Sequence, residues 1–499
     1  MPPKPSCPSV QAAAPRPECG ESPRPRWKPT FDGQTLVRTV RHLKPIQIWY
    51  QFWRRVQRGL EAHPKCADAE LPEFTFLNVT AKPKGWNDES LELLWRYNLH
   101  YFDWLNNVAL TQRRRDAECA ERYEEDIVLR WIDDNPRGSF PGWEPYPTSL
   151  RIVNWVKWLS SSRVEHVERV ESSLKKQALY LRSHLEYHLL ANHLLANAKA
   201  LVFAGKYLDR RDLYEKGMSI YRKQLPEQTC GDGVNFERSP MYHAIIFEDM
   251  LDLAEFTDEE LFKEYAAKMC AGMKLLTGPD GKIAKFNDSA EGIAKQPAEL
   301  LARAEKFGGV EMEEGRLSGF LRQESGNYVL LAKCGEIGPS YQPGHAHADT
   351  NSFELWKSGK KVVGDTGCST YIPGPIRSYE RSTRAHNTVV IDGRDSSEVW
   401  ASHRVGRRFD TKSHRREFEL TEGGLKGVDS LGGSCEHDVE VRFHLPPGVA
   451  KDELIIECPG KLKWEECEIA EGWNMRKPGL CAVYSLRRSF PTTIEWKIK

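Results

Sequence analysis

The feature that most constrains the fold is a change of hydrophobic period near Gly308 and Gly309. From about Gln34 to Lys306, apolar residues recur at helical spacing in successive segments, separated by short turns of Gly, Pro, Asp and Asn. After the two glycines the apolar residues alternate instead, in runs such as 327–333 and 387–392. A series of helices followed by a series of strands predicts an α+β multidomain chain. We expect helical hairpins arranged around an axis, followed by an antiparallel β-sandwich.

The same pattern gives domain boundaries. We expect a disordered, proline-rich tail over 1–33, a helical domain over 34–310 and a β domain over 320–499. Residues 90–111 are predicted to form one long helix, with Asn87, Asp88 and Glu89 at its start. Further helices are predicted at 118–133, 147–161, 165–186, 190–204, 209–226, 240–255, 258–276 and 296–306. The sequence beyond about residue 459 shows no readable period.

Composition limits the partners and the chemistry. Lys plus Arg and Asp plus Glu are both 71, so a formal net charge of zero gives no reason to expect nucleic acid or a membrane surface. The 12 Cys are scattered without a Cys-x-x-Cys pair, which disfavours a thiolate zinc site. No apolar run reaches the length of a membrane span, and the N-terminus lacks the apolar core of a signal peptide.

Two polar clusters lie in the predicted helical domain. Asn192 and His193 stand at a helix start, where they are either a cap with a buried polar pair or a functional pair. In residues 235–243, Pro240 suits the first turn of a helix. It would bring several polar side chains to one helix N-terminus, where the partial positive charge favours an anion. These side chains are Glu237, Arg238, Tyr242 and His243.

A third segment of the helical domain, residues 142–155, interleaves rings with polar groups. Such a segment is either a platform for sugar rings or a loop that caps the helices. Its candidate binding residues are Trp143, Glu144, Tyr146, Arg151 and Asn154.

In the β half, His345 and His347 stand two residues apart, and side chains on an extended chain repeat with period two. The two imidazoles therefore point the same way. Asp365 and His386, from later strands, could complete a His-Asp-His metal site and leave His345 for chemistry.

Five segments, in order along the chain, resemble the heparinase II/III-like polysaccharide lyases of the alginate lyase/heparinase superfamily. They are residues 98–105, 142–147, 192–201, 237–243 and 344–349. The resemblance extends from about residue 37 to about residue 450. It implies an N-terminal incomplete (α/α) toroid followed by a C-terminal antiparallel β-sandwich, with the active site in the cleft between them. It also implies an acidic polysaccharide or oligosaccharide substrate and a periplasmic or secreted location, which the missing signal peptide does not match.

The mechanism implied by the resemblance is β-elimination on a uronic acid. The C5 proton can be removed only if the neighbouring carboxylate charge is neutralised, a task that suits Asn192 with help from His193. Tyr242 is expected to take the proton and then protonate the departing C4 oxygen. Because a phenol titrates near pH ~10, a cation must favour the phenolate, and Arg238 and His345 are the candidates. His345 also serves as the base when the substrate epimer presents its proton on the other face.

The resemblance further assigns a structural Zn²⁺ to His347, Asp365 and His386. Glu237 joins the residues of segment 142–155 as a candidate for substrate binding. One position departs from the family pattern: Ala196 stands where an acid is expected, which predicts weaker positioning of His193.

Three other functions remain open from the sequence. An (α/α)-toroid glycoside hydrolase needs two opposed carboxylates, for which Glu237 and Asp288 are available. A metallo-β-lactamase-type hydrolase would use an His-x-His-x-Asp-His element, but Thr350 stands where its last His belongs. A non-catalytic polysaccharide-binding protein is motivated by Ala196.

Overall fold

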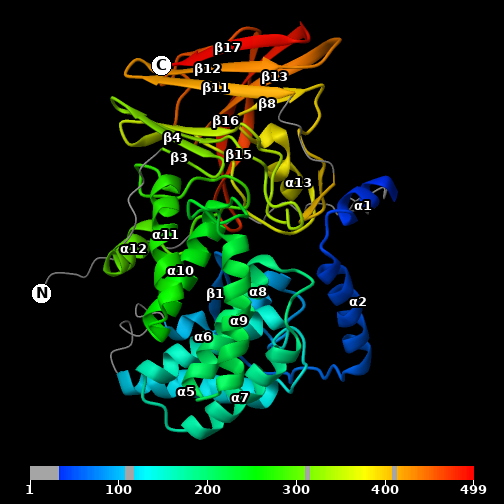
Figure 1. Ribbon diagram of the computed structural model, residues 1–499, viewed down its shortest axis with the longest axis vertical. Coiled ribbons are helices and arrows are strands. Elements are labelled where there is room, and N and C mark those ends of the chain that lie inside the picture. Colours follow the sequence, from blue (N-terminus) through cyan, green and yellow to red (C-terminus); the bar gives the residue numbers. More distant parts are fainter. Residues whose placement is uncertain (1–32, 107–116, 309–314, 407–412) are drawn as a thin grey trace, which may run out of the picture.

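A computed structural model describes residues 33–106, 117–308, 315–406 and 413–499. Helices make up most of the first half (Figure 1). In chain order they are α1 (Gly33–Val40), α2 (Pro45–Leu60), α3 (Leu93–Leu99), the 3₁₀ turn η1 (Asp103–Asn106), α5 (Ala117–Asp134), α6 (Pro145–Ser161), α7 (Val167–Ser183), α8 (Ala191–Tyr207), α9 (Arg211–Gln228), α10 (Pro240–Thr257), α11 (Glu260–Leu276), α12 (Pro297–Ala304) and η2 (Glu305–Phe307). Of the predicted tail, only Gly33 lies within the described residues.

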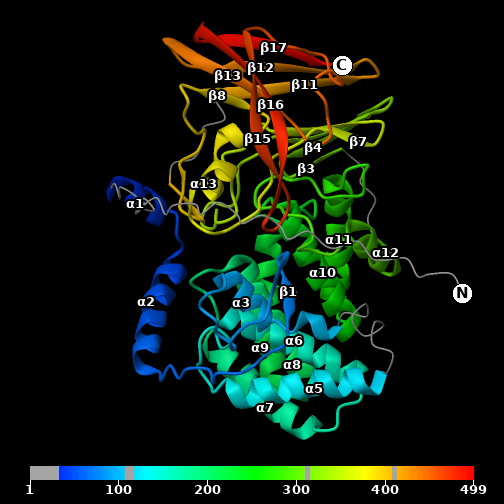
Figure 2. The same cartoon turned by 180° about the vertical axis from the view of Figure 1, so that it is seen from behind.

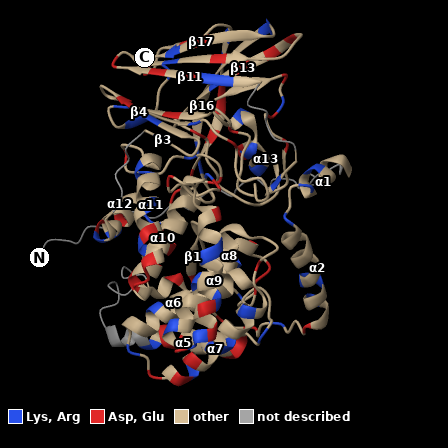
Figure 3. Ribbon diagram, viewed as in Figure 1, with Lys and Arg blue, Asp and Glu red and all other residues tan. Residues whose placement is uncertain are grey.

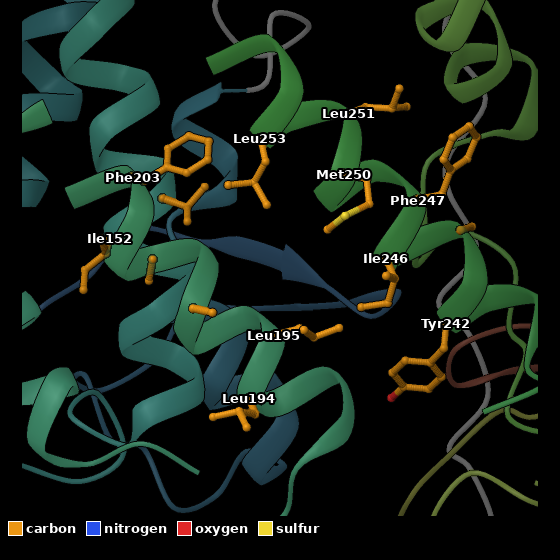
Figure 4. Close-up of a cluster of buried hydrophobic side chains, with 14 of the residues drawn as sticks. Ile152, Leu194, Leu195, Phe203, Tyr242, Ile246, Phe247, Met250, Leu251 and Leu253 are labelled. Carbon is orange, nitrogen blue, oxygen red and sulfur yellow. The ribbon is translucent and has the colours of Figure 1, made fainter. Parts of the chain in front are cut away.

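The helices pack around one large apolar core. It draws on α5 to α12, with many side chains that are completely buried, including Trp131, Trp155 and Trp158. Figure 4 shows part of it, with Leu195 of α8 pointing toward Ile246 of α10. The core continues into the β domain through Phe320, Leu331 and Trp356. The two halves are therefore held together by continuous apolar packing.

Two predictions about this half needed correction. The helix predicted over 90–111 breaks at Leu99, where Phe102 adopts a positive φ of 60° and a 3₁₀ turn follows. A short hairpin, β1 (Phe74–Phe76) with β2 (Val79–Ala81), interrupts the helices. Its turn is formed by Leu77 and Asn78, both with positive φ.

Antiparallel strands make up the second half. They are β3 (Arg316–Leu317), β4 (Phe320–Ser325), β5 (Tyr328–Lys333), β6 (Phe353–Lys357), β7 (Lys360–Val363), β8 (Val389–Ile391), β9 (Val399–Trp400), β10 (Arg404–Val405), β11 (His414–Thr421), β12 (Gly424–Leu431), β13 (Glu436–Leu445), β14 (Ile456–Glu457), β15 (Lys461–Gly472), β16 (Met475–Ser489) and β17 (Thr492–Ile498). A short helix α13 (Pro375–Arg381) and the turn η3 (Thr383–Ala385) lie between β7 and β8.

The strands form stacked sheets above the toroid (Figures 1 and 2). One sheet has the order β3-β4-β5-β6-β7, a second β11-β12-β17-β14 and a third β15-β16-β13-β8. Their inward side chains form a second core that includes Phe353, Phe443 and Trp496. The expected fold, an incomplete (α/α) toroid followed by an antiparallel β-sandwich, is confirmed by this arrangement and by the structural comparisons given below.

The unreadable C-terminal stretch contains the two longest strands, β15 and β16, which pair from Lys461 with Ser485 to Gly472 with Met475. Charged residues of both signs are scattered over both halves of the molecule (Figure 3). Among the described helices, none is long and apolar enough to cross a membrane.

Candidate active site

The site is built around the start of α10. Ser239 caps this helix by accepting the backbone N–H of Tyr242 at 3.2 Å, and Pro240 occupies its first turn. The Ser239 hydroxyl also donates to the Asp288 carbonyl at 2.6 Å, which ties the helix to the loop before the β domain. Tyr242 consequently lies at the margin of the apolar core, as Figure 4 shows.

The His345 imidazole stacks on the Tyr242 ring, with centroids 3.8 Å apart and planes at 27°. Its Nδ1 lies 2.9 Å from Asp288 Oδ2, and its Nε2 lies 3.6 Å from Glu237 Oε2. A carboxylate at Nδ1 fixes the orientation of the ring and leaves Nε2 for the reaction. The pair joins a residue of the toroid to a residue of the β domain.

The Asp288 carboxylate contacts His345, His347 and Arg377. Arg377 binds both of its oxygens, with Nη2 at 2.9 Å from Oδ2, and His347 Nε2 lies 2.8 Å from Oδ1. Burial alone raises the pKa of Asp288, but the charge of Arg377 and the hydrogen bonds from His345 and His347 outweigh it and hold this pKa well below its ordinary value. Asp288 is therefore a permanent carboxylate that orients His345.

Tyr371, which no sequence pattern singled out, completes the centre. Its hydroxyl lies 3.2 Å from that of Tyr242, and the Arg377 guanidinium stands over its ring at 4.9 Å from the centroid. Burial raises the pKa of Tyr242 well above its ordinary value, although the hydrogen bond from Tyr371 opposes this. The Tyr242 phenol is therefore protonated at neutral pH in the substrate-free protein.

Asn192 and His193 approach from the start of α8. Leu190 and Ala191, just before them, have positive φ values of 61° and 47°. Such strain in non-glycine residues costs on the order of 1–3 kcal/mol each and is found where function requires it. Asn192 is buried, and its Oδ1 has no hydrogen-bond partner among the described residues. His193 is partly exposed, and its ring centroid lies 4.6 Å from that of Tyr146.

The acid missing at Ala196 is supplied from elsewhere. Glu186, which precedes α8, places Oε1 at 3.2 Å from His193 Nδ1. Asn197 holds the other oxygen of Glu186 at 3.0 Å and accepts its backbone N–H at 2.8 Å. The expected weak positioning of His193 is therefore not what the structure has, because a rigid carboxylate still faces its ring.

Two groups of residues bear on metal binding. Ligand atoms of Asp288, His345 and His403 lie within 4.8 Å of one another. The guanidinium of Arg377 already neutralises Asp288 there, which disfavours a cation at this point.

The set predicted to hold zinc is arranged differently. Asp365 Oδ2 lies 2.8 Å from His386 Nδ1, and the rings of His347 and His386 have centroids 5.4 Å apart. His347 Nδ1 and His386 Nε2 are both buried without a hydrogen-bond partner among the described residues. Two unpartnered imidazole nitrogens beside a carboxylate suit Zn²⁺, with Asp365 orienting His386 as carboxylates do behind metal-bound histidines.

Comparison with known proteins identifies the family to which this arrangement belongs. Residues 68–306 match the heparinase II/III N-terminus, and residues 308–413 match the heparinase II/III-like C-terminal region. The chain belongs to the heparinase II/III-like family of polysaccharide lyases. The resemblance stated from the sequence is thereby confirmed.

Among similar proteins, a heparin-sulfate lyase of Bacteroides stercoris is 22% identical over 490 residues, which cover 85% of this chain and 72% of the relative. A heparin-sulfate lyase of Pedobacter heparinus is 24% identical over 360 residues, and the match covers 60% of this chain and 52% of the relative.

Solved structures show the same fold. A crystal structure of heparinase III aligns with a TM-score of 0.64 at 18% identity, covering 80% of this chain and 76% of that one. A heparan sulfate lyase of Pedobacter heparinus aligns with a TM-score of 0.56 at 19% identity, covering 81% and 76%.

Within this family fold, several residues predicted to bind substrate have structural roles instead. Arg151 is fully buried and donates to the carbonyls of His100 and Gly142 at 3.2 and 2.9 Å, so it fastens loops of the toroid. Asn154 donates to the Tyr101 carbonyl at 2.9 Å. The interpretation of 142–155 as a capping loop fits these contacts better than a sugar platform.

Trp143 and Glu144 face another part of the protein. They line a cavity of about 250 Å³ between α2 and the toroid, together with Arg54, Arg58 and His188. Glu144 is paired with Arg58 at 2.8 Å. Of the aromatic segment, Tyr146 is the residue whose ring contacts His193.

Arg238 contacts a loop of the β domain. Its guanidinium donates to the Glu336 carbonyl at 2.6 Å and lies against Gly335, which connects the toroid to a loop of the β domain. The Tyr242 side chain contacts His345 and Tyr371. A role for Arg238 in stabilising a phenolate therefore stays a prediction.

Proposed function

We propose that the protein cleaves a uronic-acid-containing glycan by β-elimination. The observation that carries this proposal is the stacking of the Tyr242 phenol on the His345 imidazole, 3.8 Å between centroids, with Asp288 and Tyr371 behind them. A β-elimination needs a proton acceptor for C5 and a proton donor for the departing C4 oxygen. An imidazole and a phenol side by side supply both.

The environments of the two side chains suggest how the roles divide. Asp288 at Nδ1 leaves His345 Nε2 to accept the C5 proton. The electron pair of that C–H bond then forms the C4–C5 double bond as the C4–O bond breaks. Tyr242, whose pKa burial raises, is the neutral phenol that gives its proton to the leaving oxygen. For the epimer whose C5 proton faces the phenol, Tyr242 reacts as the phenolate beside the His345 imidazole. It takes the C5 proton and then gives that proton to the departing C4 oxygen.

Neutralisation of the substrate carboxylate falls to the start of α8. Asn192 offers a buried side-chain amide whose Oδ1 has no partner among the described residues. An amide both donates and accepts, so it can bind a carboxyl group as negative charge develops. His193, oriented by Glu186 at 3.2 Å, adds a second polar group on the same helical turn.

We further infer that Zn²⁺ is bound by His347 and His386, with Asp365 as ligand or orienting group. A zinc ion there would brace the loop that carries His345 against the strands of the β domain. The support is the two buried imidazole nitrogens that lack partners among the described residues. None of the catalytic roles above requires the metal.

Two of the alternative functions fit the geometry less well. In a glycosidase, two carboxyl groups flank the scissile bond. Glu237 and Asp288 instead both face the same imidazole, at 3.6 and 2.9 Å, and Asp288 is locked in an ion pair. In a metallo-β-lactamase-type site Asp349 would be a ligand, but the Lys333 ammonium already binds its carboxylate.

The substrate class is tested by incubating the purified protein with a panel of acidic polysaccharides. Heparan sulfate and heparin come first, because the curated relatives are named heparin-sulfate lyases. Alginate and bacterial exopolysaccharides that contain uronic acids follow. A lyase releases an unsaturated uronide that absorbs in the ultraviolet, whereas a hydrolase releases reducing ends without that absorbance. Binding without either product would support the non-catalytic alternative.

A further inference from the structure

The helix α2 turns its apolar face away from the protein. Its residues Ile48, Trp49, Phe52 and Trp53 follow the spacing of one helical face and are 50%, 60%, 58% and 41% exposed. On an ordinary surface helix these would be the residues that face the core. Figures 1 and 2 show α2 along the outside of the toroid, with the body of the protein on one side of it.

The opposite face of α2 makes the contacts with the protein, through both polar and apolar side chains. Gln47 is 1% exposed and contacts the Tyr341 carbonyl, and Gln57 donates to the Ser183 carbonyl at 3.2 Å. Arg54 pairs with Glu144 and contacts His188. Ile46 also packs against the apolar core, and the Tyr50 ring lies 4.7 Å from that of Tyr187. Together these contacts fix the orientation of α2, so the exposure of Ile48, Trp49, Phe52 and Trp53 is built into the fold.

The preceding helix α1 also exposes apolar side chains. Leu36, Val37 and Val40 are all exposed. The other side of α1 is fastened to the β domain, where Arg38 and Thr35 bind the Glu398 carboxylate at 2.6 and 3.2 Å. Two anchored helices in succession therefore expose apolar side chains to solvent.

The charge of residues 33–60 indicates which kind of partner could bind the exposed apolar side chains of α1 and α2. Residues 33–60 contain no Asp or Glu, although they carry Arg38, Arg41, Lys44, Arg54, Arg55 and Arg58. Four of these cations have carboxylate partners. Arg41, directly after α1, and Arg55, on α2, are exposed. Glu61, the first acid after the segment, is paired with His184 at 2.7 Å. The zero net charge of the chain hides this local excess.

A second copy of the chain is a poorer occupant than an anionic surface. Two copies of α1 and α2 placed face to face would bring like charges together, which opposes association. A helix with Trp and Phe on one face, and with Arg beside them on a polar face, is typical of segments that lie in the plane of a lipid headgroup layer. Tryptophan also prefers that layer because its ring is amphipathic.

We propose that α1 and α2 dock the protein onto an anionic lipid bilayer, with the apolar surface defined by Leu36, Val37, Val40, Ile48, Trp49, Phe52 and Trp53 lying among the headgroups. The exposed arginines strengthen the contact with anionic lipid. The proposal does not depend on the lyase chemistry, because none of these residues belongs to the site around Tyr242 and His345.

The test is co-sedimentation of the full chain with vesicles of phosphatidylcholine mixed with phosphatidylglycerol, and with vesicles of phosphatidylcholine alone. The expected result is binding to the mixed vesicles that weakens as salt is added. The double variant Trp49→Ser/Phe52→Ser should bind about a hundredfold more weakly, since each of the two aromatic side chains removed from water contributes about a tenfold change. Arg41→Gln/Arg55→Gln should lose the preference for anionic lipid.

Matched controls test whether the loss of any exposed apolar side chain, rather than of one on α2, weakens vesicle binding. Ile48→Ser removes an isoleucine from α2, and Ile455→Ser removes one that is 61% exposed in the β domain. Only the first should weaken vesicle binding, and both proteins should keep the same melting temperature. Failure of the unaltered protein to sediment with mixed vesicles would overturn the proposal. So would light scattering that shows a dimer which Ile48→Ser dissociates, because the occupant would then be a second copy.

Discussion

Replacing Tyr242 with Phe separates catalysis from stability at the proposed centre. The change removes one hydroxyl and keeps the ring that stacks on His345 at 3.8 Å. Among the described residues, the hydroxyl has a hydrogen bond with Tyr371 at 3.2 Å. Losing this bond, and leaving the hydroxyl of the partly buried Tyr371 without that partner, should lower the free energy of unfolding by about 1–2 kcal/mol.

The expected effect on the rate is larger. A general acid or base contributes about 10²–10⁴-fold, which corresponds to about 3–5 kcal/mol of activation free energy. Initial rates are followed by the ultraviolet absorbance of the unsaturated product, and stability by thermal melting monitored by circular dichroism. Tyr242→Phe should therefore be almost inactive with only a small loss of stability.

Two variants act as controls. Tyr221→Phe makes the same chemical change at another buried tyrosine, whose hydroxyl donates to the Leu195 carbonyl at 3.0 Å, and should leave the rate unchanged. Tyr371→Phe removes the same hydrogen bond as Tyr242→Phe but keeps the Tyr242 phenol, so it should lose much less activity. Substantial turnover by Tyr242→Phe, or an equal loss in Tyr371→Phe, would refute the assignment of the proton to Tyr242.

Four further predictions test other parts of the structure. Asn192→Ala should lose about 10²–10³ in rate on a free uronate but much less on its methyl ester, in which the charge is already removed; equal losses on both would make Asn192 a positioning residue. Glu186→Gln should lower kcat about 10-fold or more, because it weakens a charge-assisted hydrogen bond to His193. The control Glu125→Gln makes the same change at the Glu–His contact of His166 and should leave kcat unchanged, so equal kcat values for the two variants would contradict the prediction. Burial raises the pKa of Glu380 from 4.5 to about 7, so the folded protein keeps a proton that the unfolded chain releases, and the stability this gives at low pH is lost as pH rises through about 7. Between pH 5 and pH 8, the free energy of unfolding of Glu380→Gln should therefore rise by up to about 3 kcal/mol relative to that of the unaltered protein. Melting temperatures of the two proteins that change in parallel with pH would argue against this. Zinc should co-purify, and a chelator should lower the melting temperature of the unaltered protein but not that of His386→Ala; if no metal is found and added zinc has no effect, the histidines are ordinary polar contacts.

The order of helices and strands could be predicted from the sequence because burial of one face imposes a local period. The helices at 118–133 and 147–161 correspond to α5 and α6 for this reason. Where both faces of a strand are partly exposed, the period disappears. This applies to β15, whose first residues Lys461 to Lys463 are all exposed. For this reason no strand could be predicted from the sequence beyond residue 459.

The chain by itself determined the family. It also predicted Asn192, Tyr242 and His345 as site residues, because they stand in short segments that resemble the motifs of that family. Only the tertiary structure decided what surrounds them. Tyr371 contacts Tyr242, which lies 129 residues earlier in the sequence, and Asp288 contacts His345, which lies 57 residues later. It likewise brought Glu186 to His193, buried Arg151 and turned the apolar face of α2 outward. Such contacts depend on how whole helices and strands pack, so the local hydrophobic period of the sequence cannot predict them.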